Sequence, residues 1–105
     1  MDRETLEKLA ARVDDAAHER RAIRKLSEEH PELDFERAYT IQRLSMARRV
    51  QRGESIVGMK MGLTSVAKMK QVGVHEPIYG HLTDAMMAGD GDALSMDDFI
   101  HPRAE

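Results

Sequence analysis

The chain has 105 residues, of which 41% are hydrophobic and 33% charged, and it contains neither Trp nor Cys. This balance is typical of one small, soluble globular domain and argues against an intrinsically disordered chain. A net charge of -3 gives no reason to expect nucleic acid or an anionic membrane as a partner. The lack of Cys excludes disulfide scaffolds and cysteine nucleophiles, and no apolar run reaches the length of about 18 residues that predicts a membrane span. We therefore expect a cytoplasmic protein.

The first predicted element is an amphipathic helix from residue 3 to about residue 20, with Asp2 as its N-cap. Its apolar residues recur at spacings of three and four, which places them on one face. These residues are Leu6, Leu9, Val13 and Ala16. The pattern is lost over residues 20–25, where we expect the helix to end. Pro31 closes the short segment that follows, because the residue before a proline avoids helical geometry.

A second helix is predicted from Asp34 to about Arg52, with Asp34 as its N-cap and Gly53 as its stop signal. Its apolar residues cover more than one narrow stripe, which predicts a helix buried on two sides. They are Phe35, Ala38, Tyr39, Ile41, Leu44, Met46, Ala47 and Val50.

After Gly53 the pattern changes to short segments punctuated by glycine. Residues 55–63 are apolar and predict a buried strand with close backbone approach. Thr64 or Ser65 can cap a short helix that runs to about residue 72 and ends at Gly73. Residues 77–83 predict another strand or an extended loop, residues 86–92 a turn, and residues 99–105 an extended segment.

The predicted fold class is α+β, with the helices first and the strands after them. We expect a helical region over residues 1–53 and a strand-rich region over residues 54–105. The strands have too few partners to close a sheet, so the sheet is expected to be unfinished.

Lys60 is the candidate catalytic residue, because it lies inside the apolar, glycine-flanked segment between Met59 and Met61. Burying an unpaired ammonium costs several kcal/mol, and proteins keep such lysines mainly where the charge or a lowered pKa is used. Alternation along a half-exposed strand gives a second interpretation, in which Lys60 is a solvent-facing residue. The residues alone leave both interpretations open.

The other polar groups give weak signals. The five histidines lack the i, i+4 pairing of a helical zinc site, and they are His18, His30, His75, His81 and His101. The aspartates do not follow the order of a calcium-binding loop. Glu105, taken by itself, is a terminal carboxylate of the kind that usually lies on a surface. Pattern alone therefore indicates an α+β protein with one unusual lysine.

Several motifs nevertheless resemble one known family. They are AYTIQ at residues 38–42, IVGMKMGLTS at 56–65, AKM at 67–69, GVHEPIYG at 73–80 and IHPRAE at 100–105. In this order they resemble the hydratase/decarboxylase branch of the fumarylacetoacetate hydrolase superfamily. The resemblance covers essentially the whole chain, and it implies the N-terminal helical and αβ portion of that fold, with the β-rich catalytic core mostly beyond residue 105.

Within this branch, the run Pro77-Ile78-Tyr79-Gly80 resembles the decarboxylases of 4-oxalocrotonate (2-oxo-3-hexenedioate), whereas the hydratases usually carry Asp where this chain has Ile78. The resemblance implies a carbon–carbon lyase that converts 2-oxo-3-hexenedioate into 2-hydroxypenta-2,4-dienoate and CO₂ in the meta-cleavage of aromatic compounds. One alternative is a 2-hydroxypenta-2,4-dienoate hydratase of the same branch. The other is a non-catalytic interaction domain.

The resemblance also implies roles for individual residues. Lys60 matches the active-site lysine, and Glu105 matches the first Glu of a Glu-x-Glu pair that binds Mg²⁺ or Mn²⁺. Thr64 and Ser65 are candidate donors to the substrate, and Asp84 is a candidate partner for Lys60.

One carboxylate cannot hold Mg²⁺ firmly, because this cation needs several oxygen ligands. We therefore expect the chain to be an N-terminal fragment that is inactive by itself. The family also implies a homo-oligomer, and a complex with the pathway hydratase that takes the product.

Overall fold

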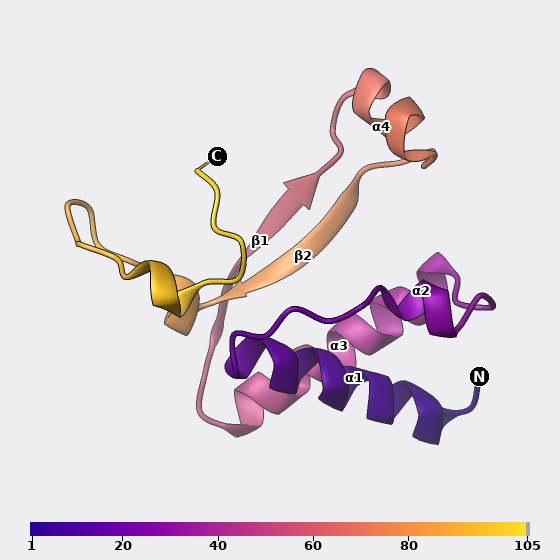
Figure 1. The fold of residues 1–105 in the computed structure, drawn as a ribbon, viewed down its shortest axis with the longest axis horizontal. Helices are drawn as coiled ribbons and strands as arrows, with labels where there is room; N and C mark the ends of the chain where they lie inside the picture. The colour runs from indigo at the N-terminus through magenta and orange to yellow at the C-terminus, as the bar shows by residue number, and fades with distance from the viewer. Residues whose placement is uncertain (105) are drawn as a thin grey trace. The chain divides into compact units, whose positions relative to one another are not determined.

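The computed structural model describes residues 1–104, which divide into two compact units. The first unit contains residues 1–52 together with the described residues from Ala88 onward. The second unit is the segment Gly53–Met87. The fold class is α+β, as predicted, with four helices and a sheet of two strands in the described part of the chain (Figure 1).

Helix α1 spans Arg3–His18 and begins where the sequence predicts. The carboxylate of Asp2 accepts a hydrogen bond of 2.8 Å from the backbone N–H of Thr5, which satisfies one of the free donors of the first turn. The helix ends two residues before the predicted Arg20. Arg20 has a φ of 56°, a left-handed conformation that a helix cannot continue.

Helix α3 spans Phe35–Gln51 and packs along α1. Asp34 caps it by accepting a hydrogen bond of 2.9 Å from the N–H of Arg37. The two helices run in the same direction, because the connection after α1 returns along the pair and makes the short helix α2 (Leu26–Glu29) before α3 starts (Figure 1).

The core of this unit is small and lies between the two helices. Leu9, Ala10 and Ile41 are buried, and six partly buried hydrophobic residues pack against them. These six are Met1, Leu6, Val13, Leu26, Leu33 and Leu44. The predicted apolar face of α1 is thereby confirmed.

The expectation that the second helix is buried on two sides is wrong for this chain. The buried residues of α3 are Ile41 and Ser45, which share one face, while Phe35 and Val50 are about half exposed. The physical reason is that α3 packs on one partner helix, α1, and a single helix–helix contact covers one stripe.

Asp14 of α1 lies in the packed face and is 1% exposed. Its carboxylate accepts hydrogen bonds from Arg48 Nε at 2.8 Å and from Arg52 Nη1 and Nη2 at 2.6 and 2.8 Å. The hydrogen bonds from Arg52 and Arg48 outweigh the effect of burial and lower the pKa of Asp14 from 3.8 to about 2. The C-terminal ends of α1 and α3 are thus joined by a charge-assisted pair.

The second unit is an antiparallel hairpin of β1 (Ile56–Gly62) and β2 (Ile78–Thr83), and helix α4 (Val66–Val72) lies in the connection between the strands (Figure 1). All three elements are predicted by the sequence. Gly73 ends α4 in the left-handed conformation, with φ 86°, which glycine adopts without steric cost.

The expectation of a buried first strand is wrong for this chain. Met59 and Met61 are 57% and 55% exposed, and Val57 is 52% exposed. A two-stranded sheet gives each strand a single hydrogen-bonded neighbour and covers neither face by itself, so an apolar strand sequence does not ensure burial.

The remaining elements are short. One-turn 3₁₀ helices occupy Asp84–Met86 and Met96–Asp98, and the segment 99–104 is neither helix nor strand. Over the described residues, no helix combines the length and apolar character that crossing a membrane requires.

Candidate active site

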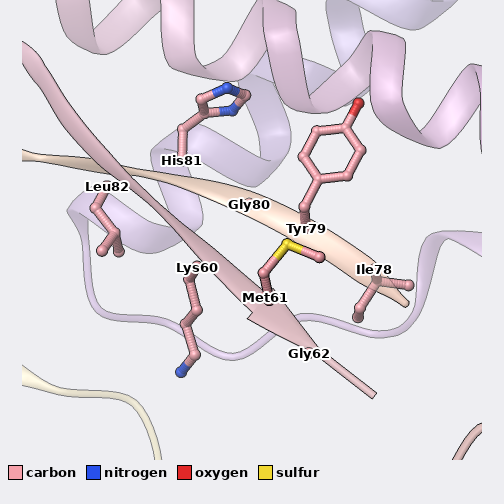
Figure 2. A pocket seen from close by; sticks show the side chains of 8 residues that line it. All are labelled: Lys60, Met61, Gly62, Ile78, Tyr79, Gly80, His81 and Leu82. Carbon is pink, nitrogen blue, oxygen red and sulfur yellow. The ribbon is translucent and has the colours of Figure 1, made fainter. Parts of the chain in front are cut away.

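The register of the hairpin decides which residues share a face with Lys60. Lys60 pairs with Gly80, while Met59 and Met61 pair with His81 and Tyr79. Successive residues of a strand point to opposite faces, and residues paired across two strands point to the same face. Lys60 therefore lies on one face of the sheet, and the methionines lie on the other. Figure 2 shows the side chains of Tyr79 and His81 leaving the sheet on the side opposite to that of Lys60.

Glycines surround Lys60 on its own face. Gly58 and Gly62 are its neighbours two residues away along β1, and Gly80 lies across from it. A Cβ atom built on Gly58 or on Gly80 would meet nothing within 4 Å, so the backbone around the lysine is open. No side chain therefore covers the sheet backbone at Gly58 and Gly80, whereas Ile78 covers it at Gly62.

Two apolar side chains flank this open area. Ile78 pairs with Gly62 and Leu82 pairs with Gly58, so both lie on the face of Lys60, as Figure 2 shows. A pocket of about 260 Å³ is lined by residues 60–62 and 78–82. Lys60, which is exposed, lines it together with Ile78 and Leu82 of its own face, and so do Met61, Tyr79 and His81, whose side chains belong to the opposite face. A cationic side chain beside apolar surface suits a small anion that carries a hydrocarbon chain.

The opposite face has a different character. The rings of Tyr79 and His81 meet edge to face, with centroids 6.1 Å apart, and Met59 and Met61 lie beside them through the strand register. This face presents the side chains of Met59 and Met61 together with the rings of Tyr79 and His81.

The structure places Thr64 and Ser65 after the end of β1, where the chain turns into α4. The hydroxyl of Ser65 accepts a hydrogen bond of 3.1 Å from the N–H of Lys68 and caps the helix. The sequence leaves the cap open between the two residues, and the structure assigns it to Ser65. Thr64 is exposed. A role for either residue in substrate binding stays a prediction.

Asp84 lies at the other end of the hairpin. Its carboxylate accepts hydrogen bonds of 3.0 Å from the N–H groups of Ser55 and Ala85. The adjacent Thr83 pairs with Ile56, four residues along β1 from Lys60, which separates the two positions by roughly 13 Å of strand. Asp84 thus holds the open end of the hairpin, and its predicted pairing with Lys60 stays a prediction.

Glu105, the predicted metal ligand, lies outside the described residues. Among residues 1–104, no three side chains of His, Cys, Asp or Glu gather in a way that could hold a metal ion. Because Mg²⁺ needs several oxygen ligands, the described residues do not fit a Mg²⁺ or Mn²⁺ site.

Sequence pattern did not single out Leu82 as part of the candidate site. A signal was available in the alternation of residues 78, 80 and 82, because every second residue of a strand shares a face. The pairing partners of these residues, which bring them to Lys60, depend on the hairpin register.

Comparison with known proteins shows what this chain is similar to. It is 43% identical to 4-oxalocrotonate decarboxylase of Pseudomonas putida over 105 residues, which are the whole chain and 40% of the relative. It is 38% identical to 2-oxo-hept-4-ene-1,7-dioate hydratase of Escherichia coli over 104 residues, which are 99% of the chain and 39% of the relative.

A solved structure gives the same result at the level of the fold. The 4-oxalocrotonate decarboxylase from Pseudomonas putida G7, complexed with magnesium and adipate, matches with a TM-score of 0.79 and 44% identity. The match covers 81% of this chain and 32% of that structure. The chain is related to these decarboxylases and hydratases. No protein-family model matches it.

The predicted resemblance and fold are thereby confirmed. The chain spans about 40% of the length of the decarboxylase and hydratase that it matches.

Proposed function

We propose that the chain supplies the lysine site of an enzyme that decarboxylates 2-oxo-3-hexenedioate to 2-hydroxypenta-2,4-dienoate and CO₂. The observation that carries the proposal is the position of Lys60 opposite Gly80, on an open sheet face between two apolar side chains. The similarity to 4-oxalocrotonate decarboxylase over the whole chain supports it.

The reaction needs positive charge next to a carboxylate and an enolate. The carbon–carbon bond that joins the distal carboxylate to the rest of the substrate breaks, and CO₂ leaves. The electron pair of that bond moves through the conjugated system onto the 2-oxo oxygen. A proton then completes the 2-hydroxy group of the product. A fixed ammonium stabilises the negative charge that develops on the oxygen, and it can also supply that proton. In the proposal, Lys60 fills this position.

Ile78 favours decarboxylation over water addition. It lies on the face of Lys60, and its side chain has no group that can accept or donate a proton. A hydratase has to handle the proton of the added water. Hydration remains the second candidate function, because the chain is also 38% identical to a hydratase.

A chimera tests the proposal directly. In it, this chain replaces the corresponding part of the Pseudomonas putida decarboxylase, and CO₂ release from 2-oxo-3-hexenedioate is measured with Mg²⁺ present. We expect CO₂ release from the chimera and none from the 105-residue chain alone. Water addition to 2-hydroxypenta-2,4-dienoate without CO₂ release would select the hydratase. A chimera that is folded but inactive in both assays would favour a non-catalytic interaction domain.

The lysine is tested in the same chimera. Lys60→Ala should lower kcat/KM by about 100-fold or more, the range of a lost charge-stabilising or proton-transfer group. Lys68→Ala is the matched control, because Lys68 is an exposed lysine in α4, and it should keep most of the activity. Equal losses in both variants would remove Lys60 from the mechanism.

Three expectations from the family stay predictions. They are the use of Mn²⁺ in place of Mg²⁺, the homo-oligomer, and the complex with the pathway hydratase. Magnesium and adipate are described for the related decarboxylase of Pseudomonas putida G7.

A further inference from the structure

The walls of the Lys60 pocket carry an inference about substrate selection. Ile78 and Leu82 are four residues apart in β2, and Gly80, the partner of Lys60, lies midway between them. In an antiparallel pair, such diagonal neighbours of Lys60 are about 7–8 Å away from it. The lysine therefore has one apolar side chain on each side, at similar separations along the strand.

The two walls differ in the space next to them, and both are partly accessible, since Ile78 is 37% exposed and Leu82 is partly buried. Ile78 packs over Gly62, where an added Cβ would come within 3.2 Å of Ile78 Cγ1 and 3.5 Å of Cδ1. Leu82 faces Gly58, where an added Cβ would meet nothing within 4 Å. The backbone at Gly62 is thus covered by the Ile78 side chain, whereas the backbone at Gly58, opposite Leu82, has free space beside it.

Charge and apolar surface together define the molecule that fits. The ammonium of Lys60 selects a carboxylate. The wall at the open end then receives the hydrocarbon chain attached to that carboxylate, since burying each CH₂ group against an apolar surface is favourable.

We propose that Leu82 is a specificity-determining residue, which contacts the hydrocarbon chain of an unbranched aliphatic dicarboxylate whose carboxylate pairs with Lys60. Ile78 covers Gly62 at the other end, so the hydrocarbon chain of the ligand extends toward the free space at Leu82. The inference rests on the proposed function for the role of Lys60 and for the dicarboxylate substrate, and it adds the residue that recognises the hydrocarbon chain of that substrate.

Binding to the 105-residue chain tests this without turnover. Methyl and amide NMR shifts are followed while adipate or acetate is added, acetate serving as a carboxylate without the longer chain. Adipate should shift the methyl signals of Leu82, and Leu82→Ala should weaken adipate binding about tenfold, the value for losing most of one leucine contact. Acetate binding should change little. Lys60→Ala should weaken both ligands.

Two further variants keep the test decisive. Leu82→Met retains an apolar side chain of similar volume and should keep the adipate affinity. Met59→Ala removes an apolar side chain from the opposite face and should leave both ligands unaffected. Amide spectra show whether each variant is folded. Equal weakening of adipate and acetate in Leu82→Ala, or no adipate binding to the unaltered chain, would overturn the inference.

The same data separate this inference from the proposed function. Adipate binding that depends on Leu82, together with a chimera that releases no CO₂, leaves the recognition site in place and removes the decarboxylase. A chimera that releases CO₂ and whose KM is unchanged by Leu82→Ala supports the decarboxylase and removes Leu82 from substrate recognition.

Discussion

Around Lys60, the residues without side chains matter as much as those with them. Gly80 lies directly across from the lysine, and Gly62 lies two residues along its own strand. Glycine in a strand costs stability, because it loses more conformational freedom on folding than other residues and packs nothing. We interpret Gly80 as a position where open space beside the ammonium is used in binding.

Two glycine-to-alanine substitutions separate the effect of open space on ligand binding from the effect of glycine on stability. The Cβ of Gly80→Ala enters open space, so this variant should be stabilised by about 0.5 kcal/mol while adipate binds more weakly. Gly62→Ala brings a Cβ to 3.2 Å from Ile78 Cγ1, and the required shift of Ile78 should cancel that gain. Urea unfolding and the NMR titration measure both quantities. A Gly80→Ala variant that binds adipate as well as the unaltered chain would contradict our interpretation.

At the scale of the elements, helix ends follow local chemistry closely. Asp2, Asp34 and Ser65 each cap the helix that follows, and Gly73 ends α4, as the sequence predicts. A cap involves a side chain and an N–H group three residues away, so the signal is contained in a short stretch of sequence. The contact between α1 and α3 is not local in sequence. Asp14 accepts hydrogen bonds from Arg48 and Arg52, which lie 34 and 38 positions further along the chain.

The Asp14 pair predicts a dependence of stability on pH. The native pKa of Asp14 is about 2 and its ordinary value is 3.8, so the folded state favours the charged form. This contribution is complete above about pH 4, is lost as the pH falls from about 4 toward 2, and is worth about 2 kcal/mol. Asp14→Asn should lower the free energy of unfolding by about that amount at pH 7 and flatten its decrease over that pH range.

Asp15→Asn is the matched control, measured by urea unfolding at several pH values. Asp15 also pairs with Arg48, at 3.1 Å, but its side chain is 54% exposed, so solvent screens the pair. Its substitution should change stability little. An equal loss in both variants would mean that the burial of Asp14 does not matter.

At the scale of the whole chain, the two units differ in how much they bury. The helical unit has a core at Leu9, Ala10 and Ile41, while the strand β1 exposes apolar side chains on a hairpin of two strands. A two-stranded hairpin is marginally stable in water by itself.

Native-state hydrogen exchange should show this difference. The amides of Leu9, Ala10 and Ile41 should be the most protected, whereas the hydrogen-bonded amides of β1 and β2 should exchange faster, because local opening there exposes little additional apolar surface. Mass spectrometry or NMR of the 105-residue chain measures the rates. Protection in β1 equal to that around Ile41 would show that the hairpin is stabilised by more than its own two strands.

Features that depend on neighbouring residues can be predicted from the order of the amino acids. Periodicity placed the first helix and its apolar face, the capping residues placed the helix starts, and the glycine-punctuated motif around Lys60 contributed to the resemblance to decarboxylases and hydratases that the comparisons confirm. These signals lie within a few residues of one another, so no knowledge of the distant chain is needed.

Burial and the pairing of distant residues could be read only from the folded chain. One-sided packing of α3, exposure of β1 and the pairing of Asp14 depend on which elements meet, and an apolar pattern does not say how many partners a segment has. The meeting of Lys60 with Ile78 and Leu82 depends on the register between strands about 20 residues apart, and a shift of one residue would move both side chains to the opposite face.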